Sequence, residues 1–310
     1  MIPAARRRAV DVNSPTEQRN PRTLEIDRLP TLDVLRLIND EDRAVADAVG
    51  AALPDLARAV DIAVDVLRGG GRVHYAGAGT SGRLAVLDAA ELVPTYNVPP
   101  DWFLAHHAGG PAALLRAVEN VEDDDTAGAA AIERHASGAD FVVGVAASGR
   151  TPFVLGALAA ARRMGARSAM IAGNPGVSRQ VDVDVMVVLD TGPEAIAGST
   201  RMKAGTAQKM ALTAFSTAVM VRMGRTYSNL MVSLVATNAK LRGRMVRILR
   251  EATGLGEREC ATALAEANGD VKTALVRLLS GVDVQRAAAA LAKADGHVRE
   301  ALARLAAGDD

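Results

Sequence analysis

The segment from Tyr75 to Glu91 most constrains the fold, because it predicts a strand, a glycine-rich loop and a helix in direct succession. A β-compatible run at 72–76 follows three glycines, and apolar residues recur at helical spacing from Leu84 onward. Between them, Gly-Ala-Gly-Thr-Ser-Gly at 77–82 lets backbone N–H groups approach an anion closely, because glycine has no Cβ. A tight turn without a ligand explains this loop equally well. The loop fits a dinucleotide fingerprint by spacing only, because no strand ending in a ribose-binding acid follows.

Two later stretches repeat the pattern. A Val-rich apolar run at 141–146 is suited to a buried parallel strand and leads into Ala-Ser-Gly-Arg-Thr-Pro at 147–152. A further strand is predicted at 185–190, after which Gly-Ser-Thr-Arg-Met-Lys-Ala-Gly-Thr at 198–206 leads into the longest helical run, 207–223. Because the carboxyl ends of parallel strands share one edge, we expect these loops to converge on one ligand. Their hydroxyls and cations favour a sugar phosphate over a nucleotide.

These three motifs resemble the SIS (sugar isomerase) domain of the N-acetylmuramic acid 6-phosphate etherases. The resemblance spans nearly the whole chain, with further matches at 16–17, 19–21, 27, 38–42, 229–232 and 236–238. It implies an α/β fold in which a parallel sheet is flanked by helices, with an N-terminal arm and helix and a small all-α lobe at the C-terminus. The length of 310 residues accommodates such a domain with appendages.

Two glutamates are the catalytic residues that the resemblance implies. Glu91 lies on the helix after the first loop, and Glu122 lies in the acidic run Val-Glu-Asn-Val-Glu-Asp-Asp at 118–124. By itself, such a run is typical of a solvated helix end. Asn120 and Val121 replace the family's usual Gly-Ala before Glu122, so Glu119 is the alternative to Glu122 as the catalytic base. In addition, Ala-Glu-Leu-Val-Pro at 90–94 replaces the frequent Ser-Glu-Cys-Pro-Pro.

The three loops supply the candidate binding groups. For the phosphate, the resemblance favours Ser81, Ser148 and Thr151, supported by Thr80 and Gly149. Arg201 and Lys203 are candidates for the phosphate or for a substrate carboxylate, and pairing within the scaffold is the alternative for each. The full set of predicted substrate-binding residues is Gly79, Thr80, Ser81, Ser148, Gly149, Arg150, Thr151, Ser199, Thr200, Arg201 and Lys203.

The implied reaction cleaves the D-lactyl ether of N-acetylmuramic acid 6-phosphate to N-acetylglucosamine 6-phosphate and D-lactate, in the recycling of peptidoglycan amino sugars. Ring opening creates a C1 aldehyde that acidifies the C2 proton. A base, assigned to Glu122, then removes this proton while an acid, assigned to Glu91, protonates the departing oxygen, and water adds at C3. The chain would be a carbon–oxygen lyase. No H-E-x-x-H motif or cysteine cluster occurs, so we expect neither a metal nor a cofactor.

Charge and composition restrict the partners. Acidic and basic residues balance at 36 each, so no broad field for nucleic acid or a membrane is expected. The only cysteine, Cys260, excludes an intrachain disulfide. Three arginines at 6–8 precede no apolar signal region, and the apolar stretch 210–223 is too short to span a bilayer. We expect a cytoplasmic protein whose partner is a small-molecule sugar phosphate.

The N-terminal region predicts an extended arm followed by a long helix. Prolines break the first forty residues, and a helical stretch at 40–67 has apolar positions that need a partner surface, with Pro54 expected to kink or divide it. The resemblance implies a homodimer with the active site near the subunit interface. We predict an arm and helix start at 1–48, the sugar-phosphate domain at 49–238 and a helical lobe at 239–310.

The C-terminal lobe contains an internal repeat, in which residues 263–279 align with 290–306. Gly269 and Gly296 fall where one helix would end and the next begin. We expect two helical hairpins that bury the repeated Leu and Val positions against each other. The lobe resembles small ubiquitin-associated-like bundles, and we assign it to packing or dimer support.

Two other classes use the same fold. A sugar-phosphate-sensing regulator would keep Ser81, Ser148 and Thr151 but need neither glutamate, whereas both are present here. An aldose–ketose isomerase would share the base at C2 but not need an acid for a leaving group at C3. The motif at 198–209 favours the etherases over this class.

Overall fold

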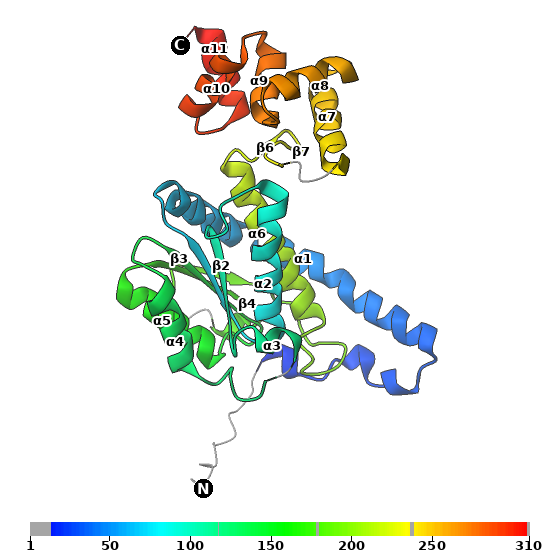
Figure 1. Ribbon diagram of the computed structural model, residues 1–310. Coiled ribbons are helices and arrows are strands. Elements are labelled where there is room, and N and C mark those ends of the chain that lie inside the picture. Colours follow the sequence, from blue (N-terminus) through cyan, green and yellow to red (C-terminus); the bar gives the residue numbers. More distant parts are fainter. Residues whose placement is uncertain (1–13, 117, 178–179, 236–238, 309–310) are drawn as a thin grey trace. The chain divides into compact units, whose positions relative to one another are not determined.

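The computed structural model describes residues 14–116, 118–177, 180–235 and 239–308 (Figure 1). The motif at 236–238 and the arginines at 6–8 lie outside these residues. The chain forms two compact units. Unit 1 contains Met1–Arg58, His74–Ala85 and Ala105–Leu212, and unit 2 contains Ala59–Val73, Val86–Leu104 and Thr213–Asp310.

A five-stranded parallel sheet with the order β2-β1-β3-β4-β5 carries the candidate site. Its strands are β1 (Val73–Gly77), β2 (Phe103–His107), β3 (Phe141–Ala146), β4 (Arg167–Ala172) and β5 (Val185–Val188). The predicted strand at 141–146 is confirmed, and β3 is buried along its whole length, as suits a central strand covered on both faces. The α/β fold with a flanked parallel sheet is therefore confirmed.

The helices account for most of the remaining chain. They are α1 (Thr31–Arg68), α2 (Gly79–Tyr96), α3 (Ala112–Leu115), α4 (Asp125–His135), α5 (Pro152–Met164), α6 (Lys203–Arg222), α7 (Ala239–Thr253), α8 (Glu257–Glu266), α9 (Val271–Ser280), α10 (Val284–Lys293) and α11 (Val298–Ala307). Short 3-10 turns occur at η1 (Pro15–Glu17), η2 (Pro21–Thr23), η3 (Ile26–Arg28) and η4 (Pro175–Val177), and β6 (Thr226–Tyr227) pairs with β7 (Leu230–Met231). None of the helices in the described residues combines the length and apolarity needed to cross a membrane.

The predictions for the N-terminal region were wrong in two respects. The described part of the arm is a series of 3-10 turns, and α1 begins at Thr31 and not at Asp40. Pro54 does not divide α1, which runs as one helix to Arg68. Pro54 and Gly50 are both exposed, so water can satisfy the carbonyl that lost its helical partner.

Two helices begin earlier than predicted. In place of a loop at 77–82, α2 starts at Gly79, so Thr80 and Ser81 lie in its first turn. Similarly, α6 starts at Lys203 and not at Ala207. The fully buried carboxylate of Glu194 accepts hydrogen bonds from the backbone N–H groups of Lys203 (2.9 Å) and Ala204 (3.0 Å). This cap comes from a distant residue, which explains why local sequence did not reveal the helix start.

Close packing of α4 and α5 positions the acidic segment before α4. A Cβ at Gly128 of α4 would lie 1.9 Å from the carbonyl oxygen of Phe153, and one at Gly156 of α5 would lie 2.0 Å from that of Asp125. Glycine is therefore required at both positions of this crossing. Within the same contact, the backbone N–H of Phe153 donates to the carbonyl oxygen of Glu122 at 3.0 Å. The Glu122 segment is thus held against the start of α5.

The C-terminal repeat folds as the predicted pair of helical hairpins, α8–α9 and α10–α11. Gly269 and Gly296 adopt φ angles of 82° and 76°, a left-handed conformation that favours glycine after a helix end. Val271 and its repeat partner Val298 are each 2% exposed within one apolar core. The predicted burial of the repeated apolar positions is therefore confirmed.

Candidate functional site

The strand order places a crevice between β1 and β3. From β1 the chain returns to β2 on one side, and from β3 it continues to β4 on the other, so the connections diverge at the carboxyl ends of these strands. Open α/β sheets bind their ligands at such a switch point. The helix α2 begins two residues after β1, and α5 follows β3 after the connection at 147–151, so both helix N-termini lie at this edge of the sheet.

A cavity of about 390 Å³ occupies this position, and we call it the switch-point cleft. Its walls come from the ends of β1 and β3, the acidic segment before α4 and the N-terminal turns. It is lined by Ser14, Glu17, Ala78, Gly79, Thr80, Ser81, Glu122, Asp123, Ala147, Ser148, Arg150, Thr151, Pro152, Asn174 and Thr200. The cleft therefore brings together residues from all three sequence motifs.

Eight predicted site residues meet in the cleft: Gly79, Thr80, Ser81, Glu122, Ser148, Arg150, Thr151 and Thr200. The others, Gly149, Ser199, Arg201, Lys203 and Glu91, are not among its lining residues. Gly149 has a supporting position, since it adopts φ 68° and a Cβ there would lie 2.5 Å from Val177. This conformation turns the chain between Ser148 and Arg150.

The hydroxyl groups in the cleft are held by short-range contacts. Ser148 Oγ accepts a hydrogen bond from the backbone N–H of Arg150 at 3.1 Å, and Asn174 Nδ2 donates to the Ser148 carbonyl oxygen at 3.3 Å. Thr151 is the N-cap residue of α5, yet its side chain makes no capping hydrogen bond. Its hydroxyl is therefore not used as a cap, whereas the N–H groups of Phe153, Val154 and Leu155 in the first turn of α5 already donate to the carbonyl oxygens of Glu122 and Thr151.

Gln208 is a functional candidate that sequence reasoning missed. It lies on α6, is 1% exposed, and its Oε1 accepts a hydrogen bond of 2.8 Å from Ser81 Oγ. Its Nε2 is buried without a partner among the described residues. Rotation of the amide by half a turn would let Nε2 donate to Ser81 and free the hydroxyl to donate into the cleft. A glutamine on the otherwise apolar face of an Ala-rich helix was the available signal.

Lys203 belongs to a buried ionic cluster outside the cleft. Its Nζ lies 2.8 Å from Glu41 Oε2, and the two side chains are 1% and 3% exposed. Glu41 also accepts hydrogen bonds from Arg22 and from Asn20 Nδ2 (2.7 Å). Chiefly the Arg22 hydrogen bond, assisted by Lys203 and Asn20, lowers the pKa of Glu41 to about 2 from 4.5. The cluster joins the motifs at 19–21, 38–42 and 198–209, which favours the scaffold alternative for Lys203.

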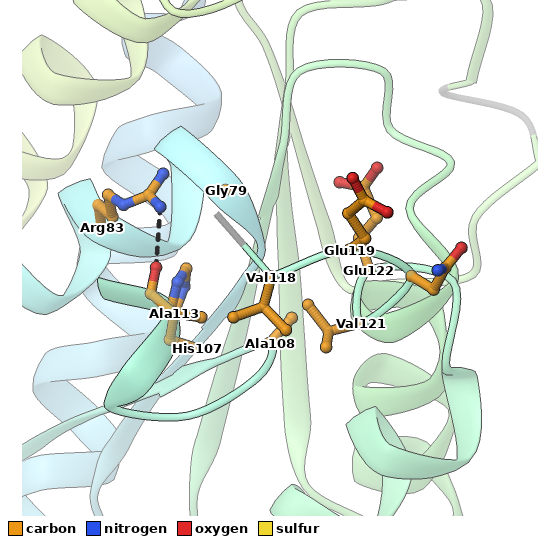
Figure 2. Close-up of a pocket in the computed structure, with 10 residues that line it drawn as sticks. Gly79, Arg83, His107, Ala108, Ala113, Val118, Glu119, Val121 and Glu122 are labelled. Atoms are coloured by element: carbon orange, nitrogen blue, oxygen red, sulfur yellow. Dashed lines mark hydrogen bonds between the residues drawn. The ribbon is translucent and has the colours of Figure 1, made fainter. Parts of the chain in front are cut away.

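A second cavity of about 430 Å³ shares Gly79 and Glu122 with the cleft, and we call it the Arg83 cavity (Figure 2). Its lining residues are Gly79, Arg83, His107, Ala108, Ala113, Val118, Glu119, Asn120, Val121 and Glu122. Asn120 adopts φ 63°, a conformation that asparagine tolerates better than most residues. The replacement of glycine at this position is therefore compatible with the turn that presents Glu122.

Glu91 lies in unit 2, exposed on α2, three helical turns after Gly79. Leu87, one turn before it, is 52% exposed. Glu122, in unit 1, is also exposed and stands at the junction of the two cavities. Its catalytic role and that of Glu91 stay predictions, as does the binding role of each residue in the cleft.

Residues 55–162 match the family model of the glucokinase regulatory protein N-terminal SIS domain. The chain is 61% identical over 269 residues to the N-acetylmuramic acid 6-phosphate etherase of Thermobifida fusca. This alignment covers 87% of the chain and 88% of the relative. The chain belongs to the N-acetylmuramic acid 6-phosphate etherases. The etherase of Symbiobacterium thermophilum is 51% identical over 265 residues, covering 86% of this chain and 88% of the relative.

This etherase chain has also been compared with solved structures. A phosphoheptose isomerase from Francisella tularensis aligns with 62% of the chain and 98% of its own length, at 18% identity and a TM-score of 0.49. The family membership rests on the etherase relatives, whose match extends well beyond the sheet.

Proposed function

We propose that the chain cleaves the D-lactyl ether of N-acetylmuramic acid 6-phosphate, yielding N-acetylglucosamine 6-phosphate and D-lactate. The observation that carries this proposal is the switch-point cleft, in which hydroxyls and helix N-termini from two strand ends meet Glu122. The names of the etherase relatives supply the substrate. A lyase of this kind serves the recycling of peptidoglycan amino sugars, and we place it in the cytoplasm, because charged sugar phosphates do not cross bilayers unaided.

The phosphate occupies the cleft in this proposal. Ser81, Ser148 and Thr151 donate hydroxyl hydrogen bonds, the first turn of α2 adds backbone N–H groups, and the N-termini of α2 and α5 add favourable dipoles. Arg150 supplies a cation from the same cleft. In this proposal, the sugar lies between the phosphate donors and Glu122.

The chemistry is an elimination followed by a hydration. The ring-opened sugar carries an aldehyde at C1, and Glu122 removes the C2 proton as the C3–oxygen bond breaks. Glu91 protonates the departing lactate oxygen, leaving a double bond between C2 and C3 conjugated with the aldehyde. Glu91 then removes a proton from water as its oxygen adds to C3, and Glu122 returns a proton to C2.

The active form is proposed to be a homodimer. Glu91 is exposed in the single chain, whereas an acid that protonates an alkoxide works best in a desolvated environment. The exposed Leu87 beside it offers apolar surface that a second copy can cover. Leu32 and Leu35 of α1, exposed at 57% and 58%, supply further surface of this kind.

The test is to incubate the purified protein with N-acetylmuramic acid 6-phosphate in water labelled with oxygen-18. For the wild type, release of unlabelled D-lactate is expected together with N-acetylglucosamine 6-phosphate that carries the label on its C3 oxygen. Glu122→Gln and Glu91→Gln are each expected to lose at least a hundredfold in kcat. A wild-type protein that binds the sugar phosphate without releasing lactate would contradict the etherase proposal and favour a sensor. Sedimentation of the active species tests the homodimer.

A further inference from the structure

The Arg83 cavity has charges of opposite sign on its two walls. In Figure 2, Arg83 and His107 lie on one side, Glu119 and Glu122 lie on the other, and Val118, Val121 and Ala108 lie between them. Glu122 and Gly79 line both this cavity and the switch-point cleft, so the two cavities are neighbours. A molecule bound in the cleft can therefore extend one substituent past Glu122 into the Arg83 cavity.

Arg83 is fixed in place without a counter-ion. Its Nε donates to the carbonyl oxygen of Leu114 at 2.9 Å, and its Nη2 donates to that of Ala113 at 2.8 Å. These carbonyls orient the guanidinium but do not neutralise it. Among the described residues, no carboxylate pairs with Arg83 and its Nη1 makes no hydrogen bond. A half-buried cation with a free donor is a site for an anion.

The neighbouring histidine adds no positive charge to this wall. Its Nδ1 would lie 2.1 Å from a Cβ at Gly82, so its ring packs closely against the first turns of α2. Burial lowers the pKa of His107, and the nearby Arg83 lowers it further. Arg83 is thus the one cation among the described residues that line the cavity.

The substrate of the proposed reaction presents a second anion at a matching position. The lactyl group is attached at C3, next to the C2 atom on which Glu122 acts, and it consists of a methyl group and a carboxylate. We propose that the Arg83 cavity is the lactyl pocket, in which Arg83 binds the carboxylate and Val118 and Val121 contact the methyl group. The carboxylates of Glu119 and Glu122 repel the lactyl carboxylate and so direct it toward Arg83.

This inference rests on the proposed function and can be tested separately from it. The probes are N-acetylmuramic acid 6-phosphate, its analogue with a carboxamide on the lactyl group, and N-acetylglucosamine 6-phosphate, which lacks the lactyl group. Affinity of each is measured by calorimetry, and lactate release gives kcat/KM. The variants are Arg83→Met, Arg83→Gln, which keeps a donor for the backbone carbonyls, and Arg134→Met, an exposed control on α4 that lines neither cavity.

We expect the wild type and Arg134→Met to prefer the carboxylate over the carboxamide by roughly 10- to 100-fold. In both Arg83 variants this preference should fall to about one, while affinity for N-acetylglucosamine 6-phosphate stays within about twofold. If the preference persists in the folded variants, or if affinity for N-acetylglucosamine 6-phosphate falls in parallel, Arg83 does not bind the lactyl group. If Arg83→Met does not fold, Arg83→Gln decides. A wild type without lactate release refutes the etherase function, and the calorimetric preference still tests Arg83.

Discussion

Replacement of Lys203 by methionine tests whether this residue belongs to the scaffold or to the substrate site. Lys203 and Glu41 are almost completely buried and lie 2.8 Å apart. The pKa of Glu41, about 2 against an ordinary 4.5, corresponds to roughly 3 kcal/mol of stabilisation by all its partners together. Removing one partner from a buried pair costs about 3–5 kcal/mol, but Arg22 and Asn20 remain bound to Glu41. We therefore expect Lys203→Met to lose about 1–3 kcal/mol.

The assay is urea unfolding at pH 7, combined with inhibition by N-acetylglucosamine 6-phosphate. Stability from Glu41 is fully present above pH 4.5 and is lost as the pH falls toward 2, because its pKa is lowered on folding. At pH 7 the whole effect should appear, whereas Lys209→Met, an exposed change on the same helix, should leave stability within about 0.5 kcal/mol. Unchanged stability together with a tenfold loss of inhibitor affinity would refute the scaffold role and identify Lys203 as a ligand.

Three further predictions concern the site and its support. Gln208→Leu should raise KM about 5- to 10-fold by freeing Ser81, and melting curves should show little loss of stability, because the apolar side chain also removes an unpaired buried amide. Burial, with the neighbouring histidines, lowers the pKa of His106 to about 4 from 6.5, so the free energy of unfolding should fall by up to about 3 kcal/mol as the pH drops from 6.5 to 4. In urea titrations, His106→Gln should reduce this dependence of stability on pH. Asn120→Val should reduce kcat, because a β-branched residue does not tolerate the φ of 63° that presents Glu122, whereas Asn120→Gly should leave kcat unchanged. Equal kcat values for the two variants in steady-state kinetics would show that this φ angle is unimportant.

The parts of the fold that sequence could predict are those with local signals. The Val-rich β3, the succession of β1 and α2 around a glycine-rich segment and the repeated helical hairpins all carry their pattern within a few residues. By contrast, β2 was not predicted, because polar His106 and His107 interrupt its apolar run. His106 is accommodated there by stacking on His74, with ring centroids 5.2 Å apart, a contact with a distant residue.

For the cleft, sequence predicted the positions of the hydroxyl-bearing residues better than those of the charged residues. The positions of these residues follow from the order of strand, turn and helix along the chain. Ser81, Ser148 and Thr151 reach the cleft because each comes soon after a strand that ends at the same edge of the sheet. By itself, the acidic run is typical of a solvated helix end, and its Asp124 does cap α4 by accepting from the Ala127 N–H at 2.9 Å. The same run nevertheless places Glu122 on two cavities, because the contact with Phe153 holds it there.

Two of the cations that follow the glycine and hydroxyl motifs show why charges are harder to place. Arg83 and Lys203 occupy similar positions in the sequence, each beside small and hydroxyl-bearing residues, and only Lys203 was considered for the substrate. Their roles depend on whether a distant carboxylate reaches them. Glu41 of α1 reaches Lys203 and neutralises it in the interior, whereas Arg83 receives only uncharged carbonyls. A cation that the fold leaves uncompensated beside a cavity is the better candidate for an anionic substrate group, and this criterion selects Arg83 over Lys203 for the lactyl carboxylate.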